Sequence, residues 1–392
     1  MSDVVIVGGG VIGAACALEL AERGASVTLI ERDHLAAHAS GRNQGLWVLP
    51  EDEANLPMAQ ASLARYLEIA PDASIDVGLD PEPVGMVLVA NDRQEFRAAK
   101  AAVAMARAHG VTVDELETPI AIRDAEPALT RNLAGCWLVH HGHRMDPGAL
   151  TVAMALAAAE RGASIRHHLH ARALAIRDGT VHGVVTDDGI IEADTTIVAG
   201  GPWSQALLDP VGVHLPIVGA RGWIARLEPD PDLLTHLIES PGQHAALRED
   251  DANLRPTATE VATDGFPDSA IGTIVHPHRD GRTVLVGSSR QTWLTPEPTE
   301  ADVIPRLLAA AIALVPALGR AKLQSSWWGL RPLSPDERPF VGGVREGLMV
   351  ATGHGSEGVI LGSGTAQLVA SQIAGEASPF DPAPFDPLRF EA

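Results

Sequence analysis

The chain has 392 residues, of which 46% are hydrophobic and 20% charged, a composition typical of a globular protein with a sizeable core. Its formal net charge of -21 argues against nucleic acid or an anionic membrane as the main partner, because both repel an acidic surface. The two cysteines, Cys16 and Cys136, are too few for a disulfide framework or a zinc site.

The N-terminal segment indicates a cytoplasmic protein. Met1 leads within a few residues into an apolar run without the basic region of a signal peptide. The longest apolar helical stretch, 307–318, is too short to span a bilayer. At roughly 150 residues per domain, the length favours two or three domains.

The first thirty residues predict a βαβ unit. Residues 4–7 form an apolar run typical of a buried parallel strand, and an alanine-rich helical pattern then extends to about Arg23. Gly24 ends this pattern, and residues 26–30 predict a second strand.

Gly8, Gly10 and Gly13 have the spacing of a dinucleotide-binding turn between the first strand and the helix. Glycines there permit a tight turn and close approach of a pyrophosphate, and Glu31 is spaced to bind the adenosine ribose. A glycine-rich turn without a ligand is the alternative, but the ordered strand, helix, strand and acidic residue favour a nucleotide site. The motif alone serves both NAD and FAD.

The remaining elements follow from periodicity and turn residues. We expect helices over 95–109, 147–161, 305–318 and 355–374, a hairpin and strand within 179–199, antiparallel strands over 216–290, and a strand at 348–351.

Four further segments span the chain in a characteristic order: Ser-Gly-Arg-Asn-Gln-Gly at 40–45, Thr-Ile-Val-Ala-Gly-Gly-Pro-Trp-Ser at 196–204, Gly-Leu-Arg-Pro-Leu-Ser-Pro-Asp at 329–336, and Gly-His-Gly-Ser-Glu-Gly at 353–358. In order and spacing this set resembles the D-amino acid oxidase family of FAD enzymes, which includes glycine oxidase, sarcosine oxidases and the β-subunits of several amino-acid and opine dehydrogenases.

The resemblance implies an α/β fold in which a Rossmann-like, glutathione-reductase-like FAD-binding domain is interleaved with an antiparallel-sheet substrate domain. The FAD domain is expected to comprise 1–80, 146–212 and 325–392, and the substrate domain 81–145 and 213–324.

The resemblance also implies a set of FAD-binding residues, with the flavin ring beside the segment that begins at Ser40 and the adenine near Ala173. The expected residues are Gly8, Gly10, Val11, Ile12, Gly13, Glu31, Arg32, Ser40, Gly41, Arg42, Asn43, Gln44, Gly45, Leu46, Ala173, Ala199, Gly200, Gly329, Gly353, His354, Gly355, Ser356, Glu357, Gly358 and Val359. A helix beginning near Gly355 would direct its positive end at the flavin, where it favours reduction. The alternative is an ordinary core helix capped by Ser356.

Arg331 is the expected substrate residue, because the matching arginine of the family pairs with the substrate carboxylate and a planar guanidinium suits that task. A structural salt bridge with Asp336 is the alternative. The implied reaction is direct hydride transfer from the amine-bearing carbon to flavin N5, giving an imine that hydrolyses. No catalytic triad or carboxylate pair is expected.

The sequence departs from the family at the pocket. Its single tyrosine, Tyr66, cannot reproduce the pocket tyrosines of some relatives, and Trp47, Trp223, Trp293 and Trp328 are candidate replacements, with core positions as the alternative. Ser356 and Glu357 stand where glycine oxidases carry a second arginine. Residues 286–291 resemble instead the β-subunits of proline, hydroxyproline and opine dehydrogenases.

The histidine clusters at 140–143 and 167–170 lack supporting cysteine or carboxylate ligands, so no metal site is expected. Neither cysteine lies in the C-terminal region where sarcosine-oxidase-like relatives attach flavin. FAD is therefore expected to bind noncovalently, with His38 as the other candidate attachment point.

Two further functions remain open. One is oxidation of a 2-hydroxy acid, which Arg331 would serve equally well, and the other is an FAD-binding β-subunit that passes electrons to a partner chain. The expected partners are an amine or amino-acid substrate and oxygen or another electron acceptor, with a partner subunit or a homo-oligomer left open.

Overall fold

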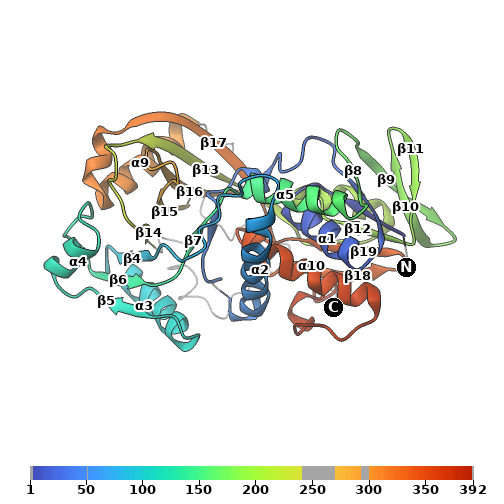
Figure 1. Cartoon of the computed structure of the whole chain (residues 1–392), viewed down its shortest axis with the longest axis horizontal. Helices are drawn as coiled ribbons and strands as arrows, with labels where there is room; N and C mark the ends of the chain where they lie inside the picture. Colours follow the sequence, from blue (N-terminus) through green and yellow to red (C-terminus); the bar gives the residue numbers. More distant parts are fainter. Residues whose placement is uncertain (1–2, 51, 241–269, 293–299, 391–392) are drawn as a thin grey trace.

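The computed structural model describes residues 3–50, 52–240, 270–292 and 300–390. Within them the strands form four sheets, which lie in two lobes joined side by side (Figure 1). In the described part of the chain, no helix has the length and hydropathy needed to cross a membrane.

The first lobe is built on a six-stranded sheet in the order β18-β19-β12-β1-β2-β8. All neighbouring strands are parallel except β18 and β19. Its strands are β1 (Asp3–Val7), β2 (Ser26–Ile30), β8 (Ser164–Arg166), β12 (Thr195–Val198), β18 (Phe340–Arg345) and β19 (Leu348–Thr352).

Helices cover one face of this sheet and a small antiparallel sheet covers the other. On the helical side, α1 packs against α5 and α10, and α10 packs against α2. These helices are α1 (Val11–Glu22), α2 (Leu56–Ile69), α5 (Pro147–Glu160) and α10 (Gly358–Ala374). The opposite side carries α6 (Ser204–Leu208) and the sheet β11-β10-β9, made of β9 (Ala171–Arg177), β10 (Thr180–Thr186) and β11 (Gly189–Glu192).

The second lobe is built on an eight-stranded sheet in the order β17-β13-β16-β15-β14-β4-β6-β5, antiparallel except between β14 and β4. Its strands are β4 (Met86–Ala90), β5 (Val113–Glu115), β6 (Gly135–Val139), β13 (Val218–Glu228), β14 (Leu237–Ser240), β15 (Ala270–Pro277), β16 (Val284–Thr292) and β17 (Lys322–Leu333).

Three helices belong to this lobe. α9 (Glu300–Leu314) packs on β13, β15 and β16, and α3 (Arg93–Ala108) packs on β4 and β6. α4 is Pro119–Ala125. A short ladder of β3 (Leu46–Trp47) and β7 (His143–Arg144) lies between the lobes in Figure 1.

The expected α/β class, with a parallel sheet and a separate antiparallel sheet, is confirmed, and so is the N-terminal βαβ unit. The domain division stays a prediction, but the expected boundary at residue 325 falls inside β17. That strand is paired along its length with β13 of the second lobe. A sequence motif alone could not reveal this pairing, because β13 lies about a hundred residues earlier in the chain.

Two helix boundaries differ from expectation. The helix expected at 305–318 begins at Glu300, with Pro305 inside it, and a 3-10 turn follows at Pro316–Arg320. The helix expected from Gly355 begins at Gly358. Gly353 and Gly355 have positive φ angles of 79° and 56°, so these residues form the turn that leads from β19 into α10.

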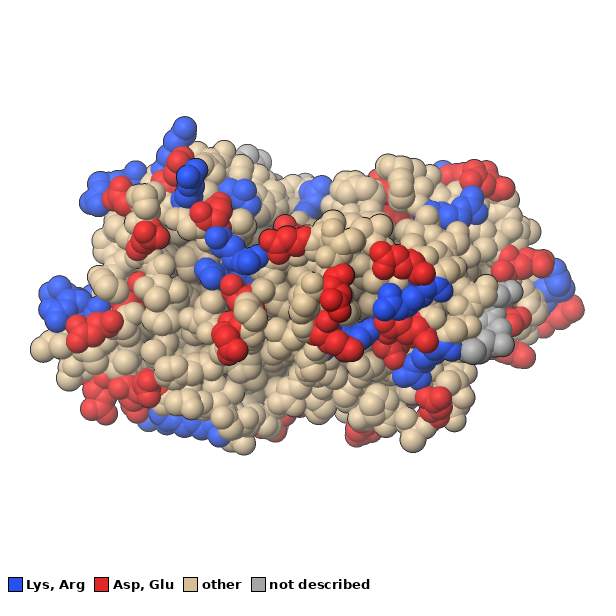
Figure 2. Space-filling view, in the orientation of Figure 1, with Lys and Arg blue, Asp and Glu red and all other residues tan. Residues whose placement is uncertain are grey.

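Figure 2 shows that lysine and arginine side chains on this face lie among aspartate and glutamate side chains, and not in one continuous basic area. Arg23, for example, pairs with Glu19 and Glu376. Such exposed pairs contribute little stability each, so the fold depends chiefly on the buried apolar clusters of the two lobes.

Candidate active site

Two cavities meet between the lobes. The smaller one, about 490 Å³, lies over the carboxyl ends of the parallel strands and is called here the nucleotide cavity. The larger one, about 600 Å³, is bounded by both lobes and is called the substrate cavity. Four residues line both of them: Ala39, Asn43, Arg331 and Ser356.

The glycine turn after β1 leaves no room for side chains. A Cβ at Gly8 would lie 2.4 Å from the carbonyl oxygen of Ala199, and a Cβ at Gly13 would lie 1.9 Å from that of Gly8. The first internal hydrogen bond of α1 runs from Ala14 N to Gly10 O, so earlier N–H groups of the helix have no helical acceptor. Free N–H groups beside a cavity suit a phosphate.

Glu31 follows β2 and is held by the glycine turn. Its Oε2 accepts a hydrogen bond from Gly9 N (2.7 Å), and its Oε1 accepts one from Asp33 N (2.9 Å). Both oxygens therefore face backbone donors, and the side chain lines the nucleotide cavity.

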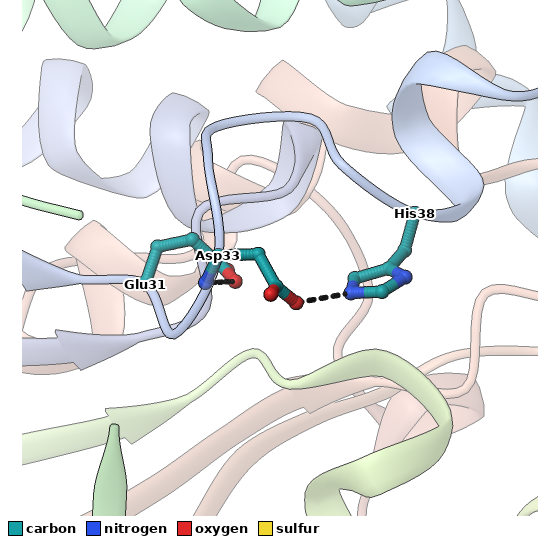
Figure 3. Close-up of side chains that lie close together, drawn as sticks. All are labelled: Glu31, Asp33 and His38. Atoms are coloured by element: carbon teal, nitrogen blue, oxygen red, sulfur yellow. Dashed lines mark hydrogen bonds and ion pairs between the residues drawn. The ribbon is translucent and has the colours of Figure 1, made fainter. Parts of the chain in front are cut away.

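Figure 3 shows Glu31 beside a pair formed by Asp33 and His38. His38 Nε2 lies 2.8 Å from Asp33 Oδ2, and this hydrogen bond holds the pKa of the Asp33 carboxyl below its ordinary value. Glu31, Asp33 and His38 lie close enough to hold a metal ion. Glu31, however, is already bonded by two backbone N–H groups, so the cluster fits a nucleotide better than a metal.

Trp203 closes the nucleotide cavity beside this cluster. The Arg32 guanidinium carbon lies 4.1 Å from the tryptophan ring centre, and the His38 ring lies 4.6 Å from it. His38 thus lies near Glu31 and is not one of the four residues shared with the substrate cavity. The alternative of flavin attachment at His38 gains no support from this position.

The segment around Ser40 is folded by its own polar side chains. Ser40 Oγ accepts a hydrogen bond from Val11 N (2.9 Å), one of the N–H groups in the first turn of α1. Asn43 Nδ2 donates to the carbonyl oxygens of Ala39 and Ser40, and its Oδ1 accepts from Gly45 N. These bonds fix the loop that separates the two cavities.

Arg331 extends from β17 across β13 toward β16. Its Nη1 donates to the carbonyl oxygen of Ser289 (3.0 Å), and a Cβ at Gly222 would lie only 2.0 Å from the same nitrogen. Burial lowers the pKa of the Arg331 guanidinium to about 10, so it remains protonated at neutral pH. Within the described residues no carboxylate is in ion-pair distance of it. The expected alternative, a pair with Asp336, is wrong, because Asp336 pairs with Arg389 (2.8 Å).

Two neutral histidines line the cavities. Burial lowers the pKa of His354 to about 3, and its Nε2 lies 3.0 Å from Thr365 Oγ1. Burial and the nearby His143 lower the pKa of His141 to about 4. The His141 ring stacks on Trp47 at 4.9 Å, and its Nδ1 accepts a hydrogen bond from Gly142 N. The neutral ring therefore carries its proton on Nε2, where it is a donor.

Most of the expected cofactor residues line one of the cavities. The nucleotide cavity is lined by Gly8, Gly10, Val11, Ile12, Glu31, Arg32, Ser40, Asn43, Ala199, Gly200, His354, Gly355, Ser356, Gly358 and Val359. The substrate cavity is lined by Arg42, Asn43, Gln44, Gly45, Leu46, Gly329, Ser356 and Glu357. Gly13, Gly41, Gly353 and Ala173 line neither.

Ala173 is exposed on β9, and the neighbouring residues 169–172 line the nucleotide cavity in its place. Sequence reasoning also missed His141, which has no motif around it. Of the candidate pocket tryptophans, Trp47, Trp223 and Trp328 line neither cavity, and Trp293 lies outside the described residues. The single tyrosine, Tyr66, is buried and donates to Val359 O (2.8 Å), away from any substrate.

Comparison with known proteins agrees with this geometry. A family model described as FAD dependent oxidoreductase matches residues 3–372. The chain is 31% identical to the bifunctional protein ThiO/ThiG of Synechocystis, over 99% of this chain and 54% of that protein, so it spans about half of that relative's length. It is 27% identical to the glycine oxidase of Pseudomonas putida, over 98% of each chain.

The structure superposes on the crystal structure of glycine oxidase from Geobacillus kaustophilus with a TM-score of 0.83 and 26% identity. This match covers 99% of this chain and 98% of that one.

Proposed function

This chain belongs to the family of FAD-dependent oxidoreductases, and on that premise we propose that it oxidises a small amino acid or secondary amine to the imine, which hydrolyses or is released. The observation that carries the proposal is the position of Arg331. It is a guanidinium without a carboxylate partner among the described residues, at the junction of the nucleotide and substrate cavities.

The residues of the nucleotide cavity fit FAD. The glycine turn and the N-terminus of α1 would hold the pyrophosphate, Glu31 the adenosine ribose, and the loop from Ser40 to Leu46 the flavin. When bound, FAD supplies the hydride acceptor. Noncovalent binding remains our proposal, as do the remaining cofactor residues expected from the sequence.

Arg331 is proposed to bind the substrate carboxylate. One of its five N–H groups is used by Ser289 O, and the others can form the paired hydrogen bonds that a carboxylate accepts. This bond fixes the α-carbon at the junction of the two cavities. A fixed orientation is the main requirement of hydride transfer, because the C–H bond must face its acceptor.

The surroundings favour the unprotonated amine that the reaction needs. Leu46, Ile224 and Leu330 line the substrate cavity and limit the access of water. Desolvation disfavours the ammonium form of a bound amine, and so lowers its pKa. We therefore assign no general base to the protein.

The alternatives gain no support from the relatives compared above, because two of them are named glycine oxidases and none is named as an enzyme of 2-hydroxy acids. The electron acceptor, oxygen or another, is left to experiment, as is a partner subunit.

The proposed function is tested by flavin reduction under anaerobic conditions. The purified protein, reconstituted with FAD, is mixed with glycine, N-methylglycine, proline, D- and L-amino acids and 2-hydroxy acids while the flavin absorption is recorded. Bleaching by an amine supports the proposal, and reoxidation on admission of air identifies oxygen as an acceptor. A protein that binds no flavin, or a flavin reduced by 2-hydroxy acids alone, would overturn it.

A further inference from the structure

One wall of the substrate cavity is an uncharged face of α3. The helix buries Ala99, Val103 and Ala106 against β4 and β6. A second face, spaced i, i+3, i+4 and i+7 along the helix, lines the cavity. Its residues are Ala98, Ala101, Ala102 and Met105.

The third face of α3 is exposed to solvent and carries charged side chains. Arg97, Lys100 and Arg107 are exposed there, and Ala104 lies among them. A surface helix normally carries charged or polar side chains wherever it is not packed. The cavity face has none, although Ala101 and Ala102 are exposed, so it has the composition of a surface that contacts an apolar group.

Apolar side chains from the sheet complete this region. Leu88 comes from β4 and Val139 from β6, and both line the cavity beside α3. We call the region formed by Leu88, Ala98, Ala101, Ala102, Met105 and Val139 the α3 compartment. The alanines leave its volume open, whereas larger side chains at the same positions would fill it.

The acidic residues of the same cavity are already engaged. Glu53 lies 3.7 Å from His109, Glu357 accepts a hydrogen bond from Asn55 Nδ2 (2.7 Å), and Glu239 also has a partner. A cationic group in the cavity would have to share these carboxylates with their present partners. An apolar group needs no such exchange, because burial against alanine and methionine stabilises it directly.

The cavity is also larger than a minimal substrate requires. Its volume of about 600 Å³ includes the part lined by residues 42–46, which would hold the flavin, but none of these residues belongs to the α3 compartment. Glycine bound by Arg331 would leave the α3 compartment empty. We propose that the substrate is an amino acid with an extended apolar group, on its α-carbon or its amine nitrogen, and that this group occupies the α3 compartment. The inference rests on the proposed function and adds the class of substrate.

The first experiment compares substrates on the FAD-loaded protein. The kcat/KM values for glycine and for D- and L-alanine, leucine and phenylalanine, with N-benzylglycine, are measured in steady-state turnover with an artificial electron acceptor. At least one of the larger compounds is expected to exceed glycine by ~10-fold or more, since each buried methylene adds to transition-state binding. If glycine is oxidised and is the best substrate, the inference fails while the proposed function stands. If no amine is oxidised, the proposed function fails.

The second experiment fills the compartment. Ala102→Trp places a large ring on the exposed cavity face, and Ala104→Trp places it on the charged face of the same helix as the matched control. Ala102→Trp is expected to lower kcat/KM for the best large substrate ~10-fold or more, and to leave kcat/KM for glycine or alanine within about twofold of the unmodified protein. Ala104→Trp is expected to change neither kcat/KM value. Equal losses for large and small substrates would contradict the inference.

A binding measurement separates the compartment from catalysis. Acetate and phenylacetate carry the carboxylate but no amine, so they bind without being oxidised, and their Kd is read from the flavin spectrum. Phenylacetate is expected to bind more tightly than acetate, and Ala102→Trp to remove that difference. Ala101→Trp provides a second filling variant if Ala102→Trp does not fold. Equal Kd values for the two acids in the unmodified protein would overturn the assignment.

Discussion

The two cavities are built in different ways. Backbone forms part of the wall of the nucleotide cavity, because Gly8, Gly10 and Gly200 carry no side chain and Glu31 is bonded by backbone N–H groups. The walls of the substrate cavity are side chains brought together from β4, α3, β13 and β17.

The difference explains what each cavity can select. A wall of backbone N–H groups binds any ligand with the same pyrophosphate and ribose, which suits a cofactor common to a family. In a wall of side chains from separate strands, a single substitution can alter the shape of the cavity, which suits a substrate that differs between relatives. Arg331, which lines both cavities, connects the constant part of the site to the variable one.

The largest expected effect is on kcat/KM when Arg331 is substituted. Arg331→Met removes the proposed partner of the substrate carboxylate. It should cost about 2–5 kcal/mol, or roughly 30- to 5,000-fold in kcat/KM, while the Kd of FAD changes little. Steady-state kinetics and flavin titration check the two quantities separately. Equal loss of both would show that Arg331 serves the nucleotide cavity instead.

Next in size is a change in the glycine turn next to the nucleotide cavity. Gly13→Ala places a Cβ 1.9 Å from Gly8 O and forces the turn apart. Overpacking of this kind costs about 1–3 kcal/mol, so the Kd of FAD should rise roughly tenfold to hundredfold. Gly343→Ala is the control, because nothing lies within 4 Å of its Cβ position. FAD affinity unchanged in Gly13→Ala would contradict the placement of the pyrophosphate.

A smaller substitution tests the wall of the substrate cavity. Gly222→Ala places a Cβ 2.0 Å from Arg331 Nη1 and must shift the guanidinium. We expect KM to rise roughly tenfold with a smaller change in kcat, because the charge survives but its geometry does not. In Gly319→Ala the new Cβ makes an ordinary contact of 3.7 Å with Ile312, so this variant should behave as the unmodified protein. Matching kinetics in the two variants would show that the position of Arg331 is not critical.

The smallest effect concerns stability and acid. Burial lowers the pKa of His354 to about 3, and burial with the charges of His278 and Arg144 does the same for His276. The unfolded chain binds a proton at each below about pH 6.5, whereas the folded protein does not until about pH 3. The free energy of unfolding should therefore fall with pH below 6.5, by roughly 1.4 kcal/mol per pH unit for each histidine.

Denaturant titrations at several pH values check this slope in both lobes. His354→Gln tests the nucleotide cavity and His276→Leu the antiparallel sheet, and each should flatten the slope, whereas exposed His167→Gln should not. A slope unchanged in either buried variant would mean that the histidine already binds its proton in the folded state.

The nucleotide cavity was predictable to a large extent because its contacts are local in sequence. Gly8, Gly13 and Glu31 lie within one βαβ unit, where strand, turn and helix geometry leave few alternatives. The structure lends the prediction less support where this locality ends. Ala173 was matched by resemblance, but the register of β9 turns it to solvent and places residues 169–172 in the wall.

The sequence by itself determined the fold class and the glycine turn, and its resemblance to the oxidase family led to the proposal for Arg331. Only the tertiary structure decided what surrounds that arginine. The pairing of β17 with β13 places Arg331 over Gly222, and packing of α3 on β4 and β6 directs its alanine face into the substrate cavity. The pairing of β13 with β17 joins residues about a hundred positions apart, and no local periodicity encodes which distant strand an edge will pair with.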